Sequence, residues 1–288
     1  MFRNLSPGAI GINTNQREAV RLASIGNFEG VDLFLEEAVE LTKKFSISYV
    51  KGIFDSFNMK IGGCGLPVAW NNKEEKVYQE GLQKLKEYAE IAQKIGCYRF
   101  ATWVPSWSDE MEYKENFSWH IKRFKPIAEI LKDFGCRLGL EFLGPFTLRE
   151  NHKYQFICNI EQMMELCSKI GVGNVGLLLD SFHWYTSKGT IEQIKNLRNE
   201  DIVYVHINDA PTGIPVEKQI DNKRNLPGET GVIDLVGFLT ALKEIGYNGP
   251  VTPEPFSEKV NGLPYELSVT LTGGYFKKVW DKVFGSSQ

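Results

Sequence analysis

The chain lacks long hydrophobic runs. Nowhere in its 288 residues is there an apolar stretch of about 18, the length that a membrane-spanning helix requires. The N-terminal residues, MFRNLSPGAIGINTN, also lack the apolar run of a secretory signal peptide. These absences argue against a membrane partner and predict a cytoplasmic protein.

Cysteines are few, and basic residues are not in excess. The five cysteines include no C-x-x-C spacing, so neither a disulfide framework nor a zinc ribbon is expected. The 33 Lys and Arg residues face 36 Asp and Glu residues, and the basic ones are scattered among the acidic ones. Nucleic acid is therefore not an expected partner.

The chain does contain a regular alternation of short apolar runs and longer amphipathic stretches. This pattern is typical of repeated βα units around a parallel sheet. The eight expected strands are 9–14, 30–35, 59–65, 98–104, 137–142, 174–180, 202–208 and 249–256. We therefore predict an α/β fold, a (β/α)₈ TIM barrel that spans residues 1–288 as a single domain. A doubly wound open sheet has the same alternation and is the alternative.

Four amphipathic segments are the clearest expected helices. Each ends at a glycine suited to the left-handed position after a helix, and they are 74–96, 117–135, 159–171 and 234–246.

In a barrel, functional side chains gather at the C-terminal ends of the strands. Barrels of this type often associate into homo-oligomers, and the sequence marks no helix face as the contact.

Four polar residues follow apolar runs at the ends of expected strands five to eight. They are Glu141 in LGLEFLG, Asp180 in GLLLDSFHWY, His206 in VYVHIND and Glu254 in VTPEPF. In a barrel they would meet on one rim. Three carboxylates and one imidazole suit one divalent metal ion, because oxygen donors favour Mn²⁺, Mg²⁺ or Co²⁺ and the imidazole also admits Zn²⁺.

The alternative for these four residues is a structural role. A single glutamate at a strand end is more often an ion-pair or capping partner than a ligand. Burying several uncompensated carboxylates together is unfavourable, however, and a bound cation would hold them ionised. A rival ion-pair network would use lysines, and the eight strand segments contain just one, Lys60. We therefore expect the carboxylates to have no internal counter-charge.

Four segments of the C-terminal half resemble a known family. They are VGLLLDSFHWY (175–185), VHINDAPTG (205–213), RNLPGETGVIDL (224–235) and ALKEIGYNGPVTPEPF (241–256). They resemble the xylose-isomerase-like sugar-phosphate isomerase/epimerase superfamily and, within it, the inosose (2-keto-myo-inositol) isomerases. The resemblance implies a metal site on the same four residues. It also implies substrate-binding roles for His183 and Arg224, although an arginine in a long polar loop is by default a solvated surface charge.

The donor set predicts proton-transfer chemistry on a sugar. A metal that chelates a ketose or keto-inositol through its carbonyl and an adjacent hydroxyl acidifies the C–H bond between them. The resemblance implies that Glu141 and Glu254 both bind the metal and act as acid and base through a cis-enediolate. We predict a divalent-metal-dependent isomerase or epimerase of a small sugar or cyclitol. A metal-dependent lyase or dehydratase that uses the same enolate chemistry is the alternative.

Two other classes of protein are alternatives to this prediction. The endonuclease IV branch of the superfamily, a DNA-repair enzyme, needs more metal ligands than this chain offers and a basic groove. A sugar-binding barrel without catalytic activity keeps the same pocket. The non-catalytic barrel would be favoured if the wild-type protein were inactive on every ketose and an E141Q/E254Q variant still bound sugar tightly.

Aromatic and histidine side chains near the strand ends are further candidates. Four aromatic residues either pack in the core or face the C–H side of a sugar, and they are Trp103, Trp107, Trp184 and Phe256. Trp103, which ends strand four, is the first candidate for a substrate contact. His120, in an expected helix, is expected at the surface. His152, in the loop after strand five, would cover the pocket as part of a lid.

Overall fold

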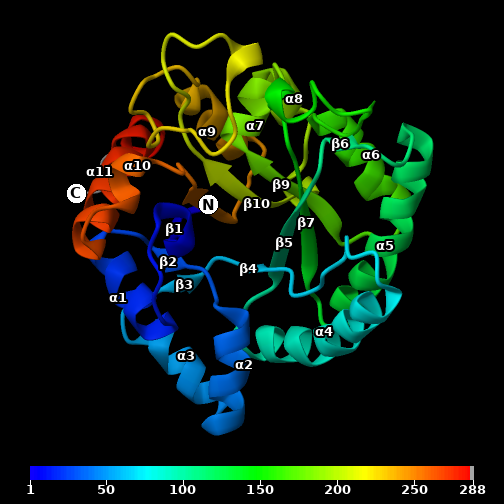
Figure 1. Cartoon of the computed structure of the whole chain (residues 1–288). Coiled ribbons are helices and arrows are strands. Elements are labelled where there is room, and N and C mark those ends of the chain that lie inside the picture. The colour runs from blue at the N-terminus through cyan, green and yellow to red at the C-terminus, as the bar shows by residue number, and fades with distance from the viewer. Residues whose placement is uncertain (286–288) are drawn as a thin grey trace.

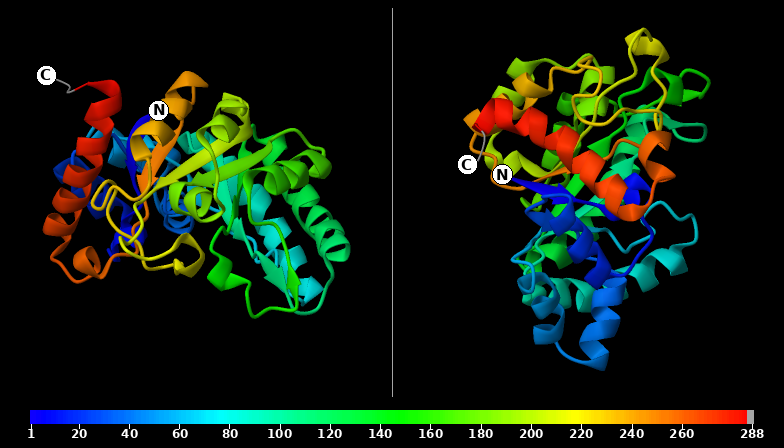
Figure 2. Two further views of the ribbon diagram at one scale, coloured as in Figure 1. Left: turned by 90° about the horizontal axis from the view of Figure 1, so that it is seen from above. Right: turned by 90° about the vertical axis from the view of Figure 1, so that its left-hand side faces the viewer.

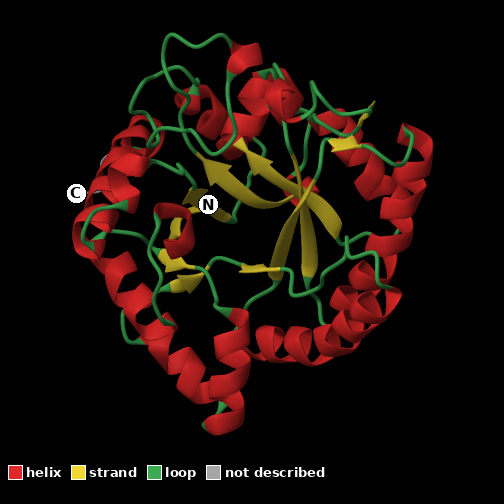
Figure 3. Cartoon of the chain, in the orientation of Figure 1, coloured by secondary structure: helices red, strands yellow, loops and turns green. Residues whose placement is uncertain are grey.

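A central parallel sheet is surrounded by helices in the structure, a computed structural model that describes residues 1–285 (Figure 1, Figure 3). In spatial order its strands are β3 (Lys60–Ile61), β2 (Gly30–Val31), β1 (Phe2–Leu5), β11 (Pro250–Pro253), β10 (Ile202–Ile207), β9 (Val175–Asp180), β7 (Arg137–Phe142), β5 (Arg99–Val104) and β4 (Cys64–Gly65). All neighbouring pairs in this sheet are parallel.

The sheet closes at its third strand. β3 pairs with β2, β4 pairs with β5, and only Gly62 and Gly63 separate β3 from β4. Residues 60–65 thus form one interrupted strand with a neighbour on each side. A Cβ on Gly62 would collide with the side chain of Asn4, so glycine is required where the strand passes this point. The fold is therefore the eight-stranded barrel that the sequence predicts.

The helices form a ring outside the barrel (Figure 1). They are α1 (Gln16–Ile25), α2 (Leu35–Lys44), α3 (Ile47–Asp55), α4 (Glu75–Ile95), α5 (Tyr113–Asp133), α6 (Ile160–Ile170), α7 (Ser181–Thr186), α8 (Ile191–Lys195), α9 (Leu235–Glu244), α10 (Glu258–Asn261) and α11 (Tyr265–Phe284). The ring closes where α11 packs against α1, which the views of Figure 2 also show. Within the described part of the chain, no helix is long and apolar enough to cross a membrane.

The glycines after the predicted helices confirm their ends. The four have positive φ angles of 108°, 67°, 75° and 72° and are Gly96, Gly135, Gly171 and Gly246. Without a Cβ they adopt this left-handed conformation at no steric cost. Helix α5 begins at Tyr113, earlier than its predicted start.

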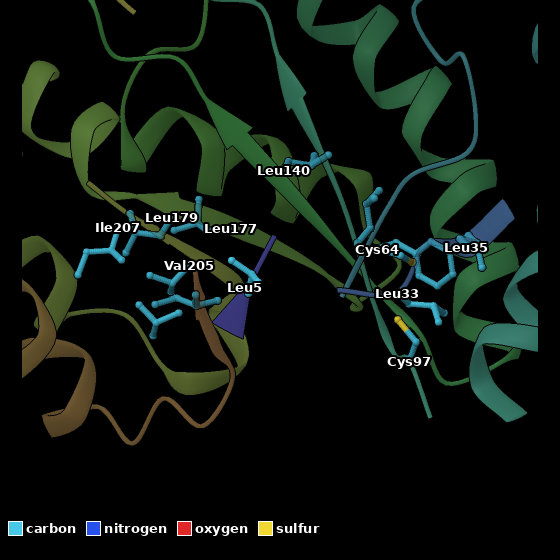
Figure 4. Packing of buried hydrophobic residues seen from close by; sticks show 14 of the residues in the cluster. Leu5, Leu33, Leu35, Cys64, Cys97, Leu140, Leu177, Leu179, Val205 and Ile207 are labelled. Atoms are coloured by element: carbon cyan, nitrogen blue, oxygen red, sulfur yellow. The ribbon is translucent and has the colours of Figure 1, made fainter. Parts of the chain in front are cut away.

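Alternate residues of the strands pack against the helices and fill the core. Leu177 and Leu179 of β9 are fully buried beside Val205 and Ile207 of β10 (Figure 4). Because side chains alternate along a strand, the residues between them point to the other face, into the barrel. This alternation aims Asp180 and the residues at 204 and 206 at the barrel interior.

The prediction of a first strand at 9–14 is wrong. The first strand is β1, and residues 7–10 form a short 3₁₀ helix followed by Gly11 at φ 74°. The sequence conceals β1 because it contains a buried polar residue, Asn4. Its amide nitrogen lies within hydrogen-bond distance of three acceptors inside the barrel, Asp32 (2.8 Å), Tyr204 (2.9 Å) and Thr252 (3.0 Å). A polar network of this kind leaves no hydrophobic pattern.

His120 is buried in α5, and its prediction as a surface residue is wrong. It is 1% exposed, and its Nδ1 lies 2.8 Å from the carbonyl oxygen of Asn116. The rings of Trp70, Trp119 and Phe156 pack against it at centroid distances of 4.7 to 5.2 Å. Burial lowers the pKa of His120 to about 4, so the imidazole is neutral at pH 7.

We expect His120 to make the fold acid-sensitive. The unfolded chain binds a proton at this residue near pH 6.5, whereas the folded chain binds it only near pH 4. The contribution of neutral His120 to the free energy of unfolding is therefore fully present above about pH 6.5. It falls as the pH decreases and is smaller by about 2 kcal/mol at pH 5.

Urea unfolding at pH 7.5 and pH 5 measures this change. Between the two pH values, the free energy of unfolding should decrease less for H120F than for the wild-type protein. An equal loss in both proteins would contradict this expectation.

Candidate metal and substrate site

The four predicted metal-site residues meet at one end of the barrel. Glu141 is the next-to-last residue of β7, Asp180 is the last of β9, and His206 is the next-to-last of β10. Glu254 follows β11 directly. In the sheet register, His206 lies opposite both Asp180 and Thr252. Each of the four residues offers one ligand atom, and these atoms lie within 4.8 Å of one another.

The Asp180 carboxylate is held by both of its oxygens. Oδ1 accepts hydrogen bonds from the backbone N–H groups of Phe182 (2.6 Å) and His183 (2.9 Å), which caps the start of α7. Oδ2 accepts hydrogen bonds from Asn208 (2.9 Å) and Arg224 (3.0 Å). This arrangement fixes the direction in which Oδ2 faces the cluster. Sequence reasoning missed Asn208, although it lies two residues after His206 in the same motif.

The His206 ring is surrounded by carboxylate oxygens. Its Nδ1 atom lies 3.3 Å from Oε1 of Glu141, 3.2 Å from Oε2 of Glu254 and 3.8 Å from Oδ2 of Asp180. Burial opposes protonation of His206, but the carboxylates of Glu254 and Glu141 outweigh it and raise the pKa well above its ordinary value. Burial raises the pKa of Glu141 against the opposing effect of His206. The centre of the cluster is therefore a position where positive charge is stabilised, which fits a bound cation.

Arg224 brings a buried positive charge to the cluster. Its side chain is 1% exposed, and Nη1 donates hydrogen bonds to Asp180 (3.0 Å) and to Oε2 of Glu254 (3.1 Å). Nη2 donates to Asp221 at 2.6 Å. Burial disfavours the charged form of Arg224, but these three carboxylates raise its pKa. For Asp180, burial is likewise outweighed by the nearby guanidinium, which lowers the pKa of the carboxyl group.

One expectation about charge is therefore corrected, because the carboxylates do have an internal counter-charge. The alternative for Arg224, a solvated surface charge, does not hold either, since its side chain is 1% exposed. The reason is that the loop containing Arg224 folds back over the ends of the strands, where the guanidinium stacks between the rings of Phe182 and Phe256 at 4.8 and 4.9 Å. Within residues 1–285, no lysine forms an ion pair with the four-residue cluster.

His183 lies beside the cluster and is 1% exposed. The backbone N–H of Gly144 lies 3.3 Å from its Nδ1, and Nη2 of Arg224 lies 3.2 Å from its Nε2. A neutral imidazole accepts a hydrogen bond at only one of its two nitrogens, so the tautomer of His183 depends on which of these contacts it keeps. Both His183 and Arg224 line the cavity described next, where a substrate oxygen would lie within reach of their N–H groups.

A cavity of about 380 Å³ opens beside these groups. It is lined by Trp103, Trp107, Glu141, Leu143, Leu148, His183, Asp221, Asn222, Arg224, Glu254 and Phe256. A smaller cavity of about 220 Å³ shares Trp103, Glu141 and Glu254 with it. Of the four candidate aromatic residues, only Trp184 lies away from both cavities, because it packs against Phe238 in the core.

The smaller cavity reaches two residues that sequence reasoning missed, Asp32 and Tyr204. The Tyr204 hydroxyl donates a hydrogen bond to Asp32 at 2.8 Å. Burial raises the pKa of Asp32 and that of Tyr204. Asp32 directly follows β2, so it carries the same signal as the four cluster residues, a polar side chain at a strand end.

The loop that contains His152 lies near the cavity. The His152 ring stacks on Trp107 with centroids 4.7 Å apart, and its Nδ1 lies 2.9 Å from Asp109. The short strands β6 (Trp107–Ser108) and β8 (Tyr154–Gln155) pair antiparallel at this point. His152 thus contacts the cavity wall through Trp107.

These observations define a class of protein, a closed parallel barrel with a buried cluster of metal-binding residue types at the ends of its strands. A family model described as "Xylose isomerase-like TIM barrel" matches residues 20–271. The chain belongs to this family.

Several relatives are enzymes of known name. An inosose isomerase of Bacillus velezensis is 26% identical over 274 residues, which cover 94% of each chain. An inosose isomerase of Bacillus subtilis is 30% identical over 203 residues, or 70% of this chain and 69% of the relative. A 3-dehydroshikimate dehydratase of Pseudomonas aeruginosa is 35% identical over 105 residues, or 36% of this chain and 16% of the relative.

Solved structures share the whole fold. A xylose isomerase domain protein from Alicyclobacillus acidocaldarius has a TM-score of 0.87 and 28% identity, with 99% of this chain and 100% of that chain covered. An IolI protein with a bound zinc atom has a TM-score of 0.80 and 24% identity, with the same coverage.

Proposed function

We propose that the protein is a divalent-metal-dependent isomerase or epimerase of a ketose or keto-inositol. The observation that carries the proposal is the convergence of Glu141, Asp180, His206 and Glu254 beside a cavity with polar and aromatic walls. The inosose isomerases among the relatives support a cyclitol or sugar as the substrate class.

The residues present fit one divalent cation. Three carboxylates and an imidazole would hold Mn²⁺, Co²⁺, Mg²⁺ or Zn²⁺, and their ligand atoms are already close together. When bound, such a cation polarises a carbonyl and an adjacent hydroxyl of the sugar and thereby acidifies the C–H bond between them.

Glu141 and Glu254 act as the proton-transfer pair. They come from different strands, both line the cavity, and each has an oxygen within 3.3 Å of His206 Nδ1. One carboxylate removes the proton from carbon, and the other returns a proton at the neighbouring carbon or on the opposite face. The stereochemistry of the substrate decides which of the two acts first.

Three residues position the substrate. His183 and Arg224 donate hydrogen bonds to the oxygen that gains negative charge as the proton leaves carbon. Trp103 is 47% exposed at the end of β5, opposite Glu141 in the sheet register, and packs against the C–H side of the sugar.

Metal titration tests the donor set. By calorimetry with Mn²⁺ we expect one ion per chain, and we expect H206A to weaken binding by about 100-fold or more because it removes a ligand. H152A, which changes a histidine outside the cluster, serves as the control and should bind Mn²⁺ normally. Equal affinity in H206A and the wild-type protein would rule out this site.

A ketose panel in D₂O with Mn²⁺ tests the reaction. The proposal expects deuterium in a carbon-bound position together with a new isomer. Loss of water from the substrate would instead identify a dehydratase, the second candidate, which the similarity to 3-dehydroshikimate dehydratase favours. Both reactions begin with the same proton removal, so the product distinguishes them.

A further inference from the structure

A separate cavity of about 350 Å³ lies next to the candidate site. The loop after the third barrel strand, the loop after β5 and the start of α5 enclose it. Three indole rings line it, those of Trp70, Trp107 and Trp119. Trp107 also lines the cavity that contains Glu141 and Glu254, so the two cavities share a wall.

Asn116 points to a ligand in this cavity. It lines the cavity and is only 2% exposed, yet its carboxamide makes no hydrogen bond with any residue in the part of the chain that the structure describes. Its backbone is fixed, because its N–H donates to Glu112 and its carbonyl lies 2.8 Å from His120 Nδ1. Because Asn116 lines the cavity, its carboxamide is available to a ligand there, and a ligand hydroxyl would hydrogen-bond to it.

The walls of this cavity are held rigidly. Arg123 donates hydrogen bonds to Glu75 (2.7 Å) and to the carbonyl oxygen of Asn72 (2.8 Å), and its guanidinium lies 5.4 Å from the Trp119 ring centroid. Trp70 donates from Nε1 to Thr102 at 3.2 Å. The aromatic faces are thus pre-positioned, which reduces the entropy lost when a ligand binds.

The chemistry of this cavity suits a carbohydrate ring. Flat indole faces pack against the C–H side of a pyranose, while an amide that can both donate and accept binds its hydroxyl groups. We propose that this cavity is a second sugar subsite, which holds a ring glycosidically attached to the ring that reacts at the metal cluster. The substrates then include disaccharides or glycosylated cyclitols. The placement of the first ring at the metal cluster rests on the proposed function. Binding of the second ring can be measured without any reaction taking place.

Binding of unreactive sugars tests the proposal. Methyl α- and β-glucosides are the one-ring probes, and cellobiose, maltose, lactose, sucrose, trehalose and galactosyl-myo-inositol are the two-ring probes. We expect calorimetry to show at least one two-ring probe bound about tenfold more tightly than the one-ring probes, and saturation-transfer NMR to show contacts to both of its rings.

Two variants locate the second ring. N116A removes an amide without protein partners, so the variant should keep the wild-type melting temperature, while its affinity for the two-ring probe should fall several-fold. W119A should lower the affinity for that probe about tenfold, and W119F should restore part of it. W280A, which removes another partly exposed tryptophan from a long helix, should leave binding unchanged.

The outcomes separate this inference from the proposed function. If no two-ring probe binds more tightly than the methyl glucosides, or if N116A and W119A leave its affinity unchanged, the second subsite is overturned whatever the activity on ketoses. If the ketose panel shows no reaction while the two-ring preference depends on Asn116 and Trp119, the subsite stands and the proposed reaction fails.

Discussion

Replacing Glu141 or Glu254 by glutamine is expected to lower kcat for proton transfer by about 10³-fold or more. Glutamine keeps the size of the side chain and an oxygen donor, but its amide cannot take up or deliver a proton at neutral pH. Positioned acid and base groups contribute rate factors of about 10² to 10⁴ each. Within residues 1–285, Glu141 and Glu254 are the two carboxylates that belong to the four-residue cluster and also line the larger cavity.

The measurement is kcat with the ketose that shows turnover, together with the rate of deuterium exchange into it. Metal content is measured in the same samples, because an amide oxygen is a weaker ligand than a carboxylate. E244Q, which changes an exposed glutamate paired with Lys195, is the control and should keep wild-type activity. If both cluster variants bind metal and retain more than a tenth of the wild-type kcat, proton transfer by this pair is excluded.

Replacing Arg224 by methionine is expected to destabilise the protein by about 3 to 5 kcal/mol in the absence of divalent metal. The guanidinium is almost fully buried and contacts Asp180, Glu254 and Asp221. Methionine fills part of the volume but leaves three buried or partly buried carboxylates without this counter-charge. Removing one partner of a buried ion pair leaves the other charge uncompensated, which is why the loss is large.

A metal ion should partly offset this loss. If a cation binds in the cluster, Mn²⁺ should raise the melting temperature of R224M by more than it raises that of the wild-type protein, since it neutralises the same carboxylates. R198M is the control. Arg198 pairs with Glu200 and Asp201 at the surface, where 68% of its side chain is exposed, so R198M should lower the free energy of unfolding by about 1 kcal/mol or less. Equal destabilisation by R224M and R198M would contradict this account.

The strand assignments show where pattern reasoning succeeds. The predicted strand 137–142 coincides with β7, and strands 174–180 and 202–208 differ from β9 and β10 only at their ends. These strands are buried on both faces, so they appear as uninterrupted apolar runs. β1 is short and its interior side is polar, so no such run marks it. β2 does lie within the predicted strand 30–35, but it covers only the first two residues of that range.

By itself, the sequence determined the barrel and the set of four residues that meet in it. The topology of a parallel barrel brings all strand ends to one rim, so a polar residue that ends an apolar run is already assigned a place in space. The tertiary structure alone decided the environment of that set. The burial of Arg224, the hydrogen bond between Asp32 and Tyr204, and the aromatic enclosure of His120 depend on which loop and helix side chains fold back against one another. Those contacts join residues far apart in the chain, and their geometry, rather than any local spacing, sets the charge and shape of the site.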